Sequence, residues 1–296
     1  MPDNAPRAAT AAGDALKSLP QYLLPHHLLS WLMQVATRLR WRPWKNWQIK
    51  WVVRRYGVNM QEALDPEPTH YPHFNSFFTR ALQAGARPLA DGVNDILCPA
   101  DGAISQIGAI REGRIFQAKG RDFTAAELLG GSIARATPFE NGSFVTVYLS
   151  PRDYHRVHMP IAGKLREMVH VPGRLFSVAP HTTRAIPRLF ARNERVVSMF
   201  DTEAGPMAVV LVGALFVASI ETVWAGVVTP PRRREIRVWD YRDSPLALER
   251  GAEMGRFNMG STAIVLFGRE KAQWDATVQA ESAVRMGQRL GTLNPM

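Results

Sequence analysis

Cysteine is nearly absent from this sequence, since Cys98 is the only one among 296 residues. A single cysteine excludes a disulfide framework and a thiolate metal cluster within one chain, which suits a reducing compartment. The first residues do not form a basic segment followed by an apolar one, so we expect no cleaved signal peptide. The longest apolar run, residues 208–220, is shorter than the roughly 20 residues that a membrane-spanning helix needs. It predicts buried strands instead.

Acidic residues are missing from residues 15–61, and this window is rich in tryptophan and basic residues. Its tryptophans are Trp31, Trp41, Trp44, Trp47 and Trp51. Its basic residues are Lys17, Arg38, Arg40, Arg42, Lys45, Lys50, Arg54 and Arg55. Indoles favour the depth of lipid headgroups and cations meet the phosphates there, so the window predicts binding to an anionic membrane surface. A helix packed on the protein's own core is an alternative. Nucleic acid is the least favoured partner, because no RNA-binding signature follows.

The chain divides into three regions by composition. Residues 1–14 are alanine-rich without a clear apolar period, so we expect a disordered tail. Residues 15–70 predict a helical, membrane-associating segment. Residues 71–296 predict a β-rich catalytic domain, because short apolar runs alternate there with Gly, Pro and Asp. The predicted fold class is α+β, with N-terminal amphipathic helices followed by an antiparallel or mixed sheet.

Local signals predict two helix starts and a series of strands. Asn75 or Ser76 is placed to cap a helix over residues 74–82, and Thr124 with Glu127 forms a capping-box pattern. Strands of a β-hairpin are expected at residues 103–110 and 114–118. Further strands are expected at residues 144–149, 164–171, 196–201, 207–212, 222–228, 235–240 and 262–267.

A glycine and a serine, Gly260 and Ser261, come just before the last of these apolar runs. Glycine has no Cβ, so its carbonyl is open to close approach. The Ser261 hydroxyl can reach the Gly260 carbonyl, and an ester would then replace the amide bond. β-Elimination would break the chain and leave a dehydroalanine, which hydrolyses to a pyruvoyl group. Taken alone, a Gly-Ser pair before a strand is more often an ordinary turn.

Three further residues could take part in such chemistry. Asp101, before Gly102, is typical of a turn, but its carboxylate could also orient a histidine. His155 and His158 could form a zinc pair, yet no third ligand follows by spacing and we expect no metal. Asp101, His158 and Ser261 follow the logic of an activated nucleophile, in which an acid orients the base that removes the hydroxyl proton. A serine hydrolase is therefore an alternative, although the chain lacks a G-x-S-x-G motif.

Four stretches taken together resemble the bacterial, membrane-associated phosphatidylserine decarboxylases. They are residues 99–102, 150–160, 221–226 and 256–262. Their order and spacing fit that family, and the resemblance runs from about residue 74 to about residue 267. One departure is Met259, where the family usually has leucine. The two side chains are similar in volume, so we expect little effect.

The resemblance implies a pyruvoyl-dependent decarboxylation of phosphatidylserine to phosphatidylethanolamine. Asp101, His158 and Ser261 fall on the family's positions for self-cleavage, and the cut would lie between Gly260 and Ser261. The covalent cofactor would be a pyruvoyl group derived from Ser261, which forms a Schiff base with the substrate amine. His155 matches the first histidine of the family's pair, and we expect it to be the proton donor in decarboxylation.

The resemblance also implies partners and a location. The substrate would be a phospholipid, and the enzyme would lie on the cytoplasmic side of the inner membrane as a peripheral protein. A large chain, residues 1–260, would stay with a small chain, residues 261–296, and this pair could form a homodimer. Arg152 and Arg156 are candidates for phosphate or carboxylate contact, and Trp224 is expected in the core. The non-catalytic alternative is a basic membrane-surface adaptor.

Overall fold

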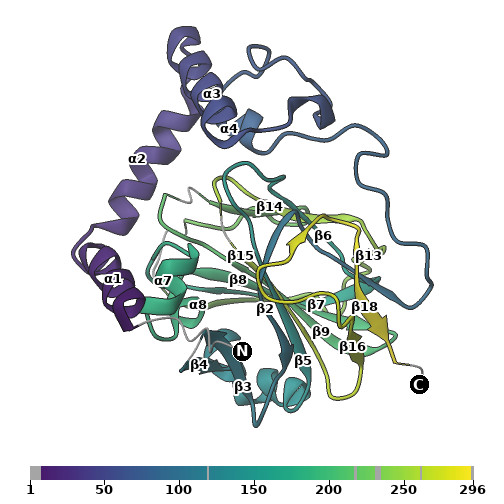
Figure 1. The fold of residues 1–296 in the computed structure, drawn as a ribbon. Helices are drawn as coiled ribbons and strands as arrows, with labels where there is room; N and C mark the ends of the chain where they lie inside the picture. Colours follow the sequence, from purple (N-terminus) through teal and green to yellow (C-terminus); the bar gives the residue numbers. More distant parts are fainter. Residues whose placement is uncertain (1–7, 119, 217–218, 231–234, 261, 295–296) are drawn as a thin grey trace, which may run out of the picture.

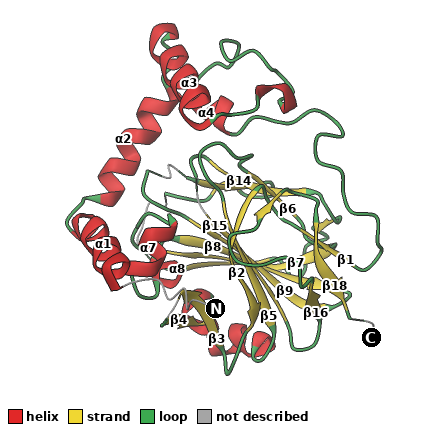
Figure 2. Cartoon of the chain, in the orientation of Figure 1, coloured by secondary structure: helices red, strands yellow, loops and turns green. Residues whose placement is uncertain are grey.

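The computed structural model describes residues 8–118, 120–216, 219–230, 235–260 and 262–294. An arm of N-terminal helices runs along one side of a β-rich body (Figure 1), and strands make up most of that body (Figure 2). The strand pairs of the described sheets are all antiparallel. The predicted α+β class is therefore confirmed.

The helices of the described chain form two groups. The arm contains α1 (Ala8–Ser18), η1 (Leu19–Tyr22), α2 (His26–Arg38), α3 (Arg42–Tyr56), η2 (Met60–Glu62) and α4 (Phe74–Phe78). The body contains α5 (Ala125–Leu128), α6 (Ile133–Ala136), η3 (Thr137–Phe139), α7 (Pro180–Ala185) and α8 (Leu189–Arg192). Side chains of α5, η3 and α8 join the core on one face of the large sheet.

The large sheet has nine strands within the described residues. Their order is β12-β7-β8-β9-β15-β5-β2-β17, and β13 also pairs with β7. The strands are β2 (Gly102–Ala109), β5 (Ser143–Tyr148), β7 (Gly163–Val171), β8 (Arg195–Thr202), β9 (Gly205–Val212), β12 (Arg237–Asp240), β13 (Ala247–Leu248), β15 (Thr262–Phe267) and β17 (Ala283–Val284).

The strand that follows the Gly-Ser pair, β15, lies in the middle of this sheet between β5 and β9. Ala263, Val265 and Phe267 face one core, and Ile264 and Leu266 face the other. Both faces are thus covered, which explains why the strand reads as an unbroken apolar run. Because β15 begins at Thr262, the loop that carries Gly260 leads into the sheet between β5 and β9.

Smaller sheets bring polar stretches that are distant in the sequence together in space. One sheet has the order β11-β10-β14-β6, from β6 (Arg156–His158), β10 (Ile220–Thr222), β11 (Gly226–Val227) and β14 (Glu253–Phe257). The others pair β1 (Asp95–Leu97), β18 (Arg289–Leu293) and β16 (Ala272–Trp274), and β3 (Arg114–Ala118) with β4 (Arg121–Thr124). Because β6 pairs with β14, the two-histidine stretch lies beside the chain that leads to Gly260.

Two of the strand predictions are wrong. The hairpin expected from residues 103–110 and 114–118 does not form, because β2 pairs with β5 and β17, whereas β3 pairs with β4. Ile115 and Phe123 of the β3–β4 pair are buried in the core and account for this choice. The single strand expected over residues 222–228 is instead a short hairpin, since β10 and β11 pair with each other.

Two helix predictions also change. α1 begins at Ala8, inside the range expected to be a disordered tail, and alanine is the strongest helix former. Residues 1–7 lie outside the described residues. The cap of α4 is His73, whose side chain accepts a hydrogen bond from the Ser76 backbone, and the helix ends at Phe78. The capping box of Thr124 and Glu127 is confirmed.

The arm has a small hydrophobic core of its own, which continues into the body. Ile49 and Val52 of α3 pack with Phe74, Phe77 and Phe78 of α4 in one buried cluster. The boundary predicted between residues 70 and 71 therefore runs through a packed core. In the described residues, no helix is long and apolar enough to cross a membrane.

Candidate active site

The loop between β14 and β15 carries the predicted cleavage site. Its described residues are Asn258, Met259 and Gly260, while Ser261 lies outside the described residues. Met259 has a φ of 156°, a backbone angle that side-chain-bearing residues seldom adopt. The Met259 side chain packs against the buried cluster of α3 and α4. The peptide that precedes Gly260 is thus held in an unfavourable conformation by packing.

His155 lies directly beside Gly260. A Cβ built on Gly260 would be 3.5 Å from His155 Nε2. The His155 side chain is fully buried, and its Nδ1 donates a hydrogen bond to the Asp153 carbonyl over 2.8 Å. Nε2 therefore carries the lone pair, and among the described residues it has no hydrogen-bond partner. A buried nitrogen of this kind next to the predicted scissile bond is the strongest chemical feature of the site.

The surroundings of His155 keep its ring neutral. The Phe78 ring of α4 lies against it, with 3.9 Å between ring centroids. Burial, helped by the positive charge of Arg80, lowers the pKa of His155 to about 3. At neutral pH the ring is therefore uncharged, and Nε2 is available to accept a proton or a hydrogen bond.

His158 has two hydrogen-bond partners of its own, one in the turn before β14 and one in the loop before β6. Its Nδ1 donates to the Gly251 carbonyl over 2.8 Å, and its Nε2 accepts from the Tyr154 hydroxyl over 3.1 Å. Burial lowers the pKa of His158, and the negative charge of Asp101 is among the influences that oppose this shift. The His158 backbone N–H donates to the Pro99 carbonyl, so the stretch that holds Asp101 lies next to it.

Asp101 is buried in a network of charges and backbone groups. Its carboxylate accepts hydrogen bonds from Arg87 Nε over 2.8 Å and from the Met286 N–H over 2.9 Å. Arg87 is buried as well and also pairs with Glu62. In the part of the chain that the structure describes, Asp101 and His158 share no hydrogen bond. The next residue, Gly102, starts β2, and a side chain there would clash with the Tyr148 carbonyl oxygen.

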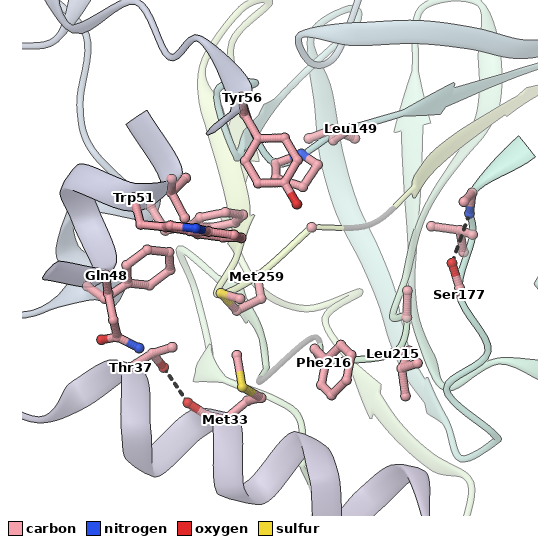
Figure 3. A pocket seen from close by; sticks show the side chains of 18 of the residues that line it. Met33, Thr37, Gln48, Trp51, Tyr56, Leu149, Ser177, Leu215, Phe216 and Met259 are labelled. Carbon is pink, nitrogen blue, oxygen red and sulfur yellow. Dashed lines mark hydrogen bonds between the residues drawn. The ribbon is translucent and has the colours of Figure 1, made fainter. Parts of the chain in front are cut away.

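An apolar cavity of about 460 Å³ reaches Gly260 from the side of the arm (Figure 3). Its walls come from the arm, from two loops of the body and from the end of β5. The lining includes Met33, Thr37, Trp47, Gln48, Trp51, Tyr56, Tyr148, Leu149, Ser177, Val178, Ala179, Ala214, Leu215, Phe216, Met259 and Gly260. Sequence reasoning missed most of these residues, because the loops at residues 177–179 and 214–216 carry no motif of their own.

One wall of the cavity is fastened to the start of the arm. The Gln21 side chain accepts a hydrogen bond from the Ser177 N–H over 2.8 Å, and His26 Nδ1 accepts from the Leu175 N–H over 3.2 Å. The pKa of His26 is lowered by burial. His27 Nε2 donates to the Gly173 carbonyl over 3.0 Å. The arm is therefore an integral part of the cavity.

The outer side of the arm combines exposed apolar and basic side chains. Trp41, Trp47 and Trp51 are 67%, 58% and 50% exposed. Trp47 and Trp51 also border a hollow that is lined by Lys50, Arg54 and Arg55. These two indoles thus separate a basic outer surface from the apolar cavity.

The remaining predicted residues have structural contacts. Arg156 donates to Glu253 and to the Thr79 carbonyl, whereas the Arg152 side chain is exposed. Trp224 packs against the main core, as expected, with its indole N–H 3.3 Å from Met168 Sδ.

Comparison with known proteins gives consistent matches. A family model described as phosphatidylserine decarboxylase matches residues 74–292, and a second, described as PSD, matches residues 16–57. Similar proteins include the phosphatidylserine decarboxylase proenzyme of Pseudomonas putida, which is 62% identical over 275 residues, 92% of this chain and 96% of the relative. The protein of that name from Pseudomonas aeruginosa is 60% identical over 278 residues, 93% of this chain and 96% of the relative.

The antiparallel fold thus brings the buried His155 beside Gly260, at the end of an apolar cavity. The matches extend over most of the chain. The chain therefore belongs to the phosphatidylserine decarboxylase family.

Proposed function

We propose that this protein is a pyruvoyl-dependent carboxy-lyase that converts phosphatidylserine to phosphatidylethanolamine and carbon dioxide. It would first cut its own chain between Gly260 and Ser261. The observation that carries the proposal is the position of the buried His155 Nε2 beside Gly260, where the apolar cavity ends and no other described residue bonds to this nitrogen. The name of the relatives, which contains both the lipid and the word proenzyme, supports the substrate and the maturation.

In the proposed maturation, the Ser261 hydroxyl attacks the Gly260 carbonyl and gives up its proton, so the peptide bond becomes an ester. β-Elimination releases the Gly260 carboxylate and leaves a dehydroalanine, which water converts to a pyruvoyl group and ammonia. We assign Asp101, His158 and Ser261 to the relay for this step, with His158 as the base. The unfavourable angle at Met259 and the missing Cβ of Gly260 both favour reaction at this bond.

The residues around Gly260 fit a pyruvoyl group at position 261, because His155 Nε2 lies beside Gly260 and has no hydrogen-bond partner among the described residues. When bound, such a group would supply a ketone for the substrate amine and would take up the electrons left by decarboxylation. We assign His155 Nε2 as the atom that delivers a proton to the substrate α-carbon after carbon dioxide leaves.

The cavity and the arm support a lipid as the substrate. The cavity walls near Trp51, Phe216 and Met259 are apolar, which suits the glycerol and acyl part of a phospholipid. The exposed tryptophans and the cations of α3 suit a peripheral position on an anionic membrane, on the cytoplasmic side. The arm would then place the cavity at the membrane surface.

After cleavage, the small chain would remain bound. β15 pairs along its full length with β5 and β9, and its side chains are buried on both faces. β16, β17 and β18 pair with one another or with strands of the large chain. Separating the chains would expose this apolar surface to water, which is strongly unfavourable.

The decisive experiment is an intact-mass measurement of the purified protein under denaturing conditions, with Ser261→Ala as the control. We expect two chains that divide after Gly260, the smaller one beginning with a ketone in place of the serine, and a single chain for the variant. A wild-type protein that stays whole after long incubation would contradict the proposal. Labelling of that whole chain by a fluorophosphonate would indicate a serine hydrolase, and no labelling would indicate an adaptor.

The substrate is tested separately on the mature protein. Vesicles containing phosphatidylserine should yield phosphatidylethanolamine and carbon dioxide, and sodium cyanoborohydride should inactivate the enzyme only when substrate is present. Equal turnover of free serine would contradict a role of the lipid part in binding.

A further inference from the structure

A chain of buried side-chain amides lies immediately before the predicted cleavage site. The Asn258 side chain is only 2% exposed, and its Nδ2 donates a hydrogen bond to Ser219 Oγ over 2.6 Å. The Asn258 backbone N–H donates to the Ser219 carbonyl over 2.9 Å. Asn258 Oδ1 accepts from Asn75 Nδ2 over 3.0 Å. Asn258 is therefore fixed from two sides, two residues before Gly260.

The second amide belongs to the helix that also contacts His155. Asn75 lies on α4, and the Phe78 ring of the same helix packs on the His155 ring. Just past the helix, Thr79 donates two hydrogen bonds to the Asn75 carbonyl, and its own carbonyl accepts one from Arg156 of β6. The short helix α4 therefore contacts both His155 and Asn258, which lies on the chain that leads to Gly260.

The polar composition of this network is unfavourable for packing alone. Asn75, Asn258 and Ser219 are 7%, 2% and 1% exposed, and the described part of the chain offers Asn75 Oδ1 no hydrogen-bond partner. Burying such groups costs free energy unless they are hydrogen-bonded, so apolar side chains would fill the same space at lower cost. The amides contribute orientation, because each hydrogen bond fixes the orientation of the backbone segments that it joins.

The next residue, Met259, has a backbone conformation that depends on such orienting contacts. Met259 has the unusual φ of 156°. A backbone angle of this kind persists only where the surrounding contacts determine it. Asn258 supplies those contacts on the N-terminal side, and the Met259 side chain is packed against the α3–α4 cluster. Together they set the direction in which the Gly260 carbonyl points relative to His155.

We propose that Asn258, held by Asn75 and Ser219, is a positioning residue for self-cleavage. Its role is to orient the Gly260 carbonyl for attack by the Ser261 hydroxyl, and it takes no part in proton transfer. The inference rests on the proposed function, since it concerns the same bond. A misplacement of about 1 Å in such a geometry can slow a reaction by about 100-fold.

The test compares the rate of chain cleavage in freshly synthesised protein. Wild type, Asn258→Leu, Asn75→Leu and Ser219→Ala are made by cell-free translation, and the two chains are separated on a gel over time. Leucine has nearly the shape of asparagine but cannot form the hydrogen bonds. We expect cleavage to be roughly 10- to 100-fold slower in Asn258→Leu, with a smaller loss in Ser219→Ala, which removes one hydrogen bond only.

A matched control separates positioning from a general loss of stability. Gln117 of β3 is also a buried amide, 1% exposed, and bonds to the Thr183 and Ile186 carbonyls and to the Leu189 N–H. It is absent from the lining of the cavity at Gly260. Gln117→Leu should lower the thermal midpoint as Asn258→Leu does, yet cleave at the wild-type rate when both are folded at low temperature.

Hydroxylamine at neutral pH shows which chemical step is affected, because it cleaves an ester and leaves ordinary amides intact. Only fragments that divide after Gly260 are counted, since the Asn141–Gly142 bond is itself split by alkaline hydroxylamine. If Asn258 positions the carbonyl, the uncut Asn258→Leu chain should be an amide that hydroxylamine does not split. An accumulated ester would overturn the inference, as would cleavage at the wild-type rate or an equal slowing in Gln117→Leu. If wild type itself does not cleave, the proposed function fails, which is a different outcome.

Discussion

The complete burial of His155 predicts how the free energy of unfolding depends on pH. The pKa of His155 is lowered from an ordinary value of 6.5 to about 3, because burial disfavours the charged ring. Between these values the unfolded chain binds a proton at this residue and the folded chain does not. Acidification below pH 6.5 therefore lowers the free energy of unfolding, by about 1.4 kcal/mol per pH unit for one such group. At two units below 6.5 the contribution is about 2.7 kcal/mol.

Urea denaturation followed by circular dichroism measures this effect. The comparison uses Ser261→Ala as the parent, so that every sample is one chain, and adds His155→Gln to it. The difference in unfolding free energy between parent and variant should shift by about 2.3 kcal/mol between pH 6.5 and pH 4.5, in favour of the variant at the lower pH, because the unfolded histidine is already half protonated at pH 6.5. Adding Gln117→Leu, at a buried residue that does not titrate, is the control and should leave the slope unchanged. If the unfolding free energy depends on pH equally with and without His155, the ring is protonated in the folded protein and is not buried beside Gly260.

Three further predictions concern maturation, stability and substrate. His158→Gln should block chain cleavage, whereas His155→Gln should mature and lose turnover, as read from gels and from product formation; the reverse pattern would exchange the two assignments. Arg87→Met leaves the buried carboxylate of Asp101 without its ion-pair partner, and should lower the free energy of unfolding by about 3–5 kcal/mol in urea denaturation; a loss under 1 kcal/mol would mean that water replaces the arginine. Met33→Trp narrows the cavity from the arm, and should reduce turnover of long-chain phosphatidylserine more than that of a short-chain form; an equal effect on both would place the acyl chains elsewhere.

Much of the β-rich body was predictable from local patterns. Continuous apolar runs such as residues 207–212 and 262–267 became β9 and β15, because both faces of the central strands are buried. The Thr124–Glu127 capping box formed because its hydrogen bonds join residues three apart. Strand partners were less predictable: the turn at residues 112–113 looked like that of a hairpin, but burial of Ile115 and Phe123 drew β3 toward β4.

By itself, the sequence determined the order of the motifs and the basic, tryptophan-rich character of the arm, and it predicted the candidate reactive residues, since these depend on residue types and spacing. Only the tertiary structure decided which groups meet. It placed His155, rather than His158, against Gly260, and it paired the Asp101 carboxylate with Arg87. It also assembled the cavity from the arm and from loops without motifs. His155 and Gly260 are more than a hundred positions apart in the sequence, as are the arm and the body loops of the cavity. Only the packing of the sheet and the arm brings such residues together.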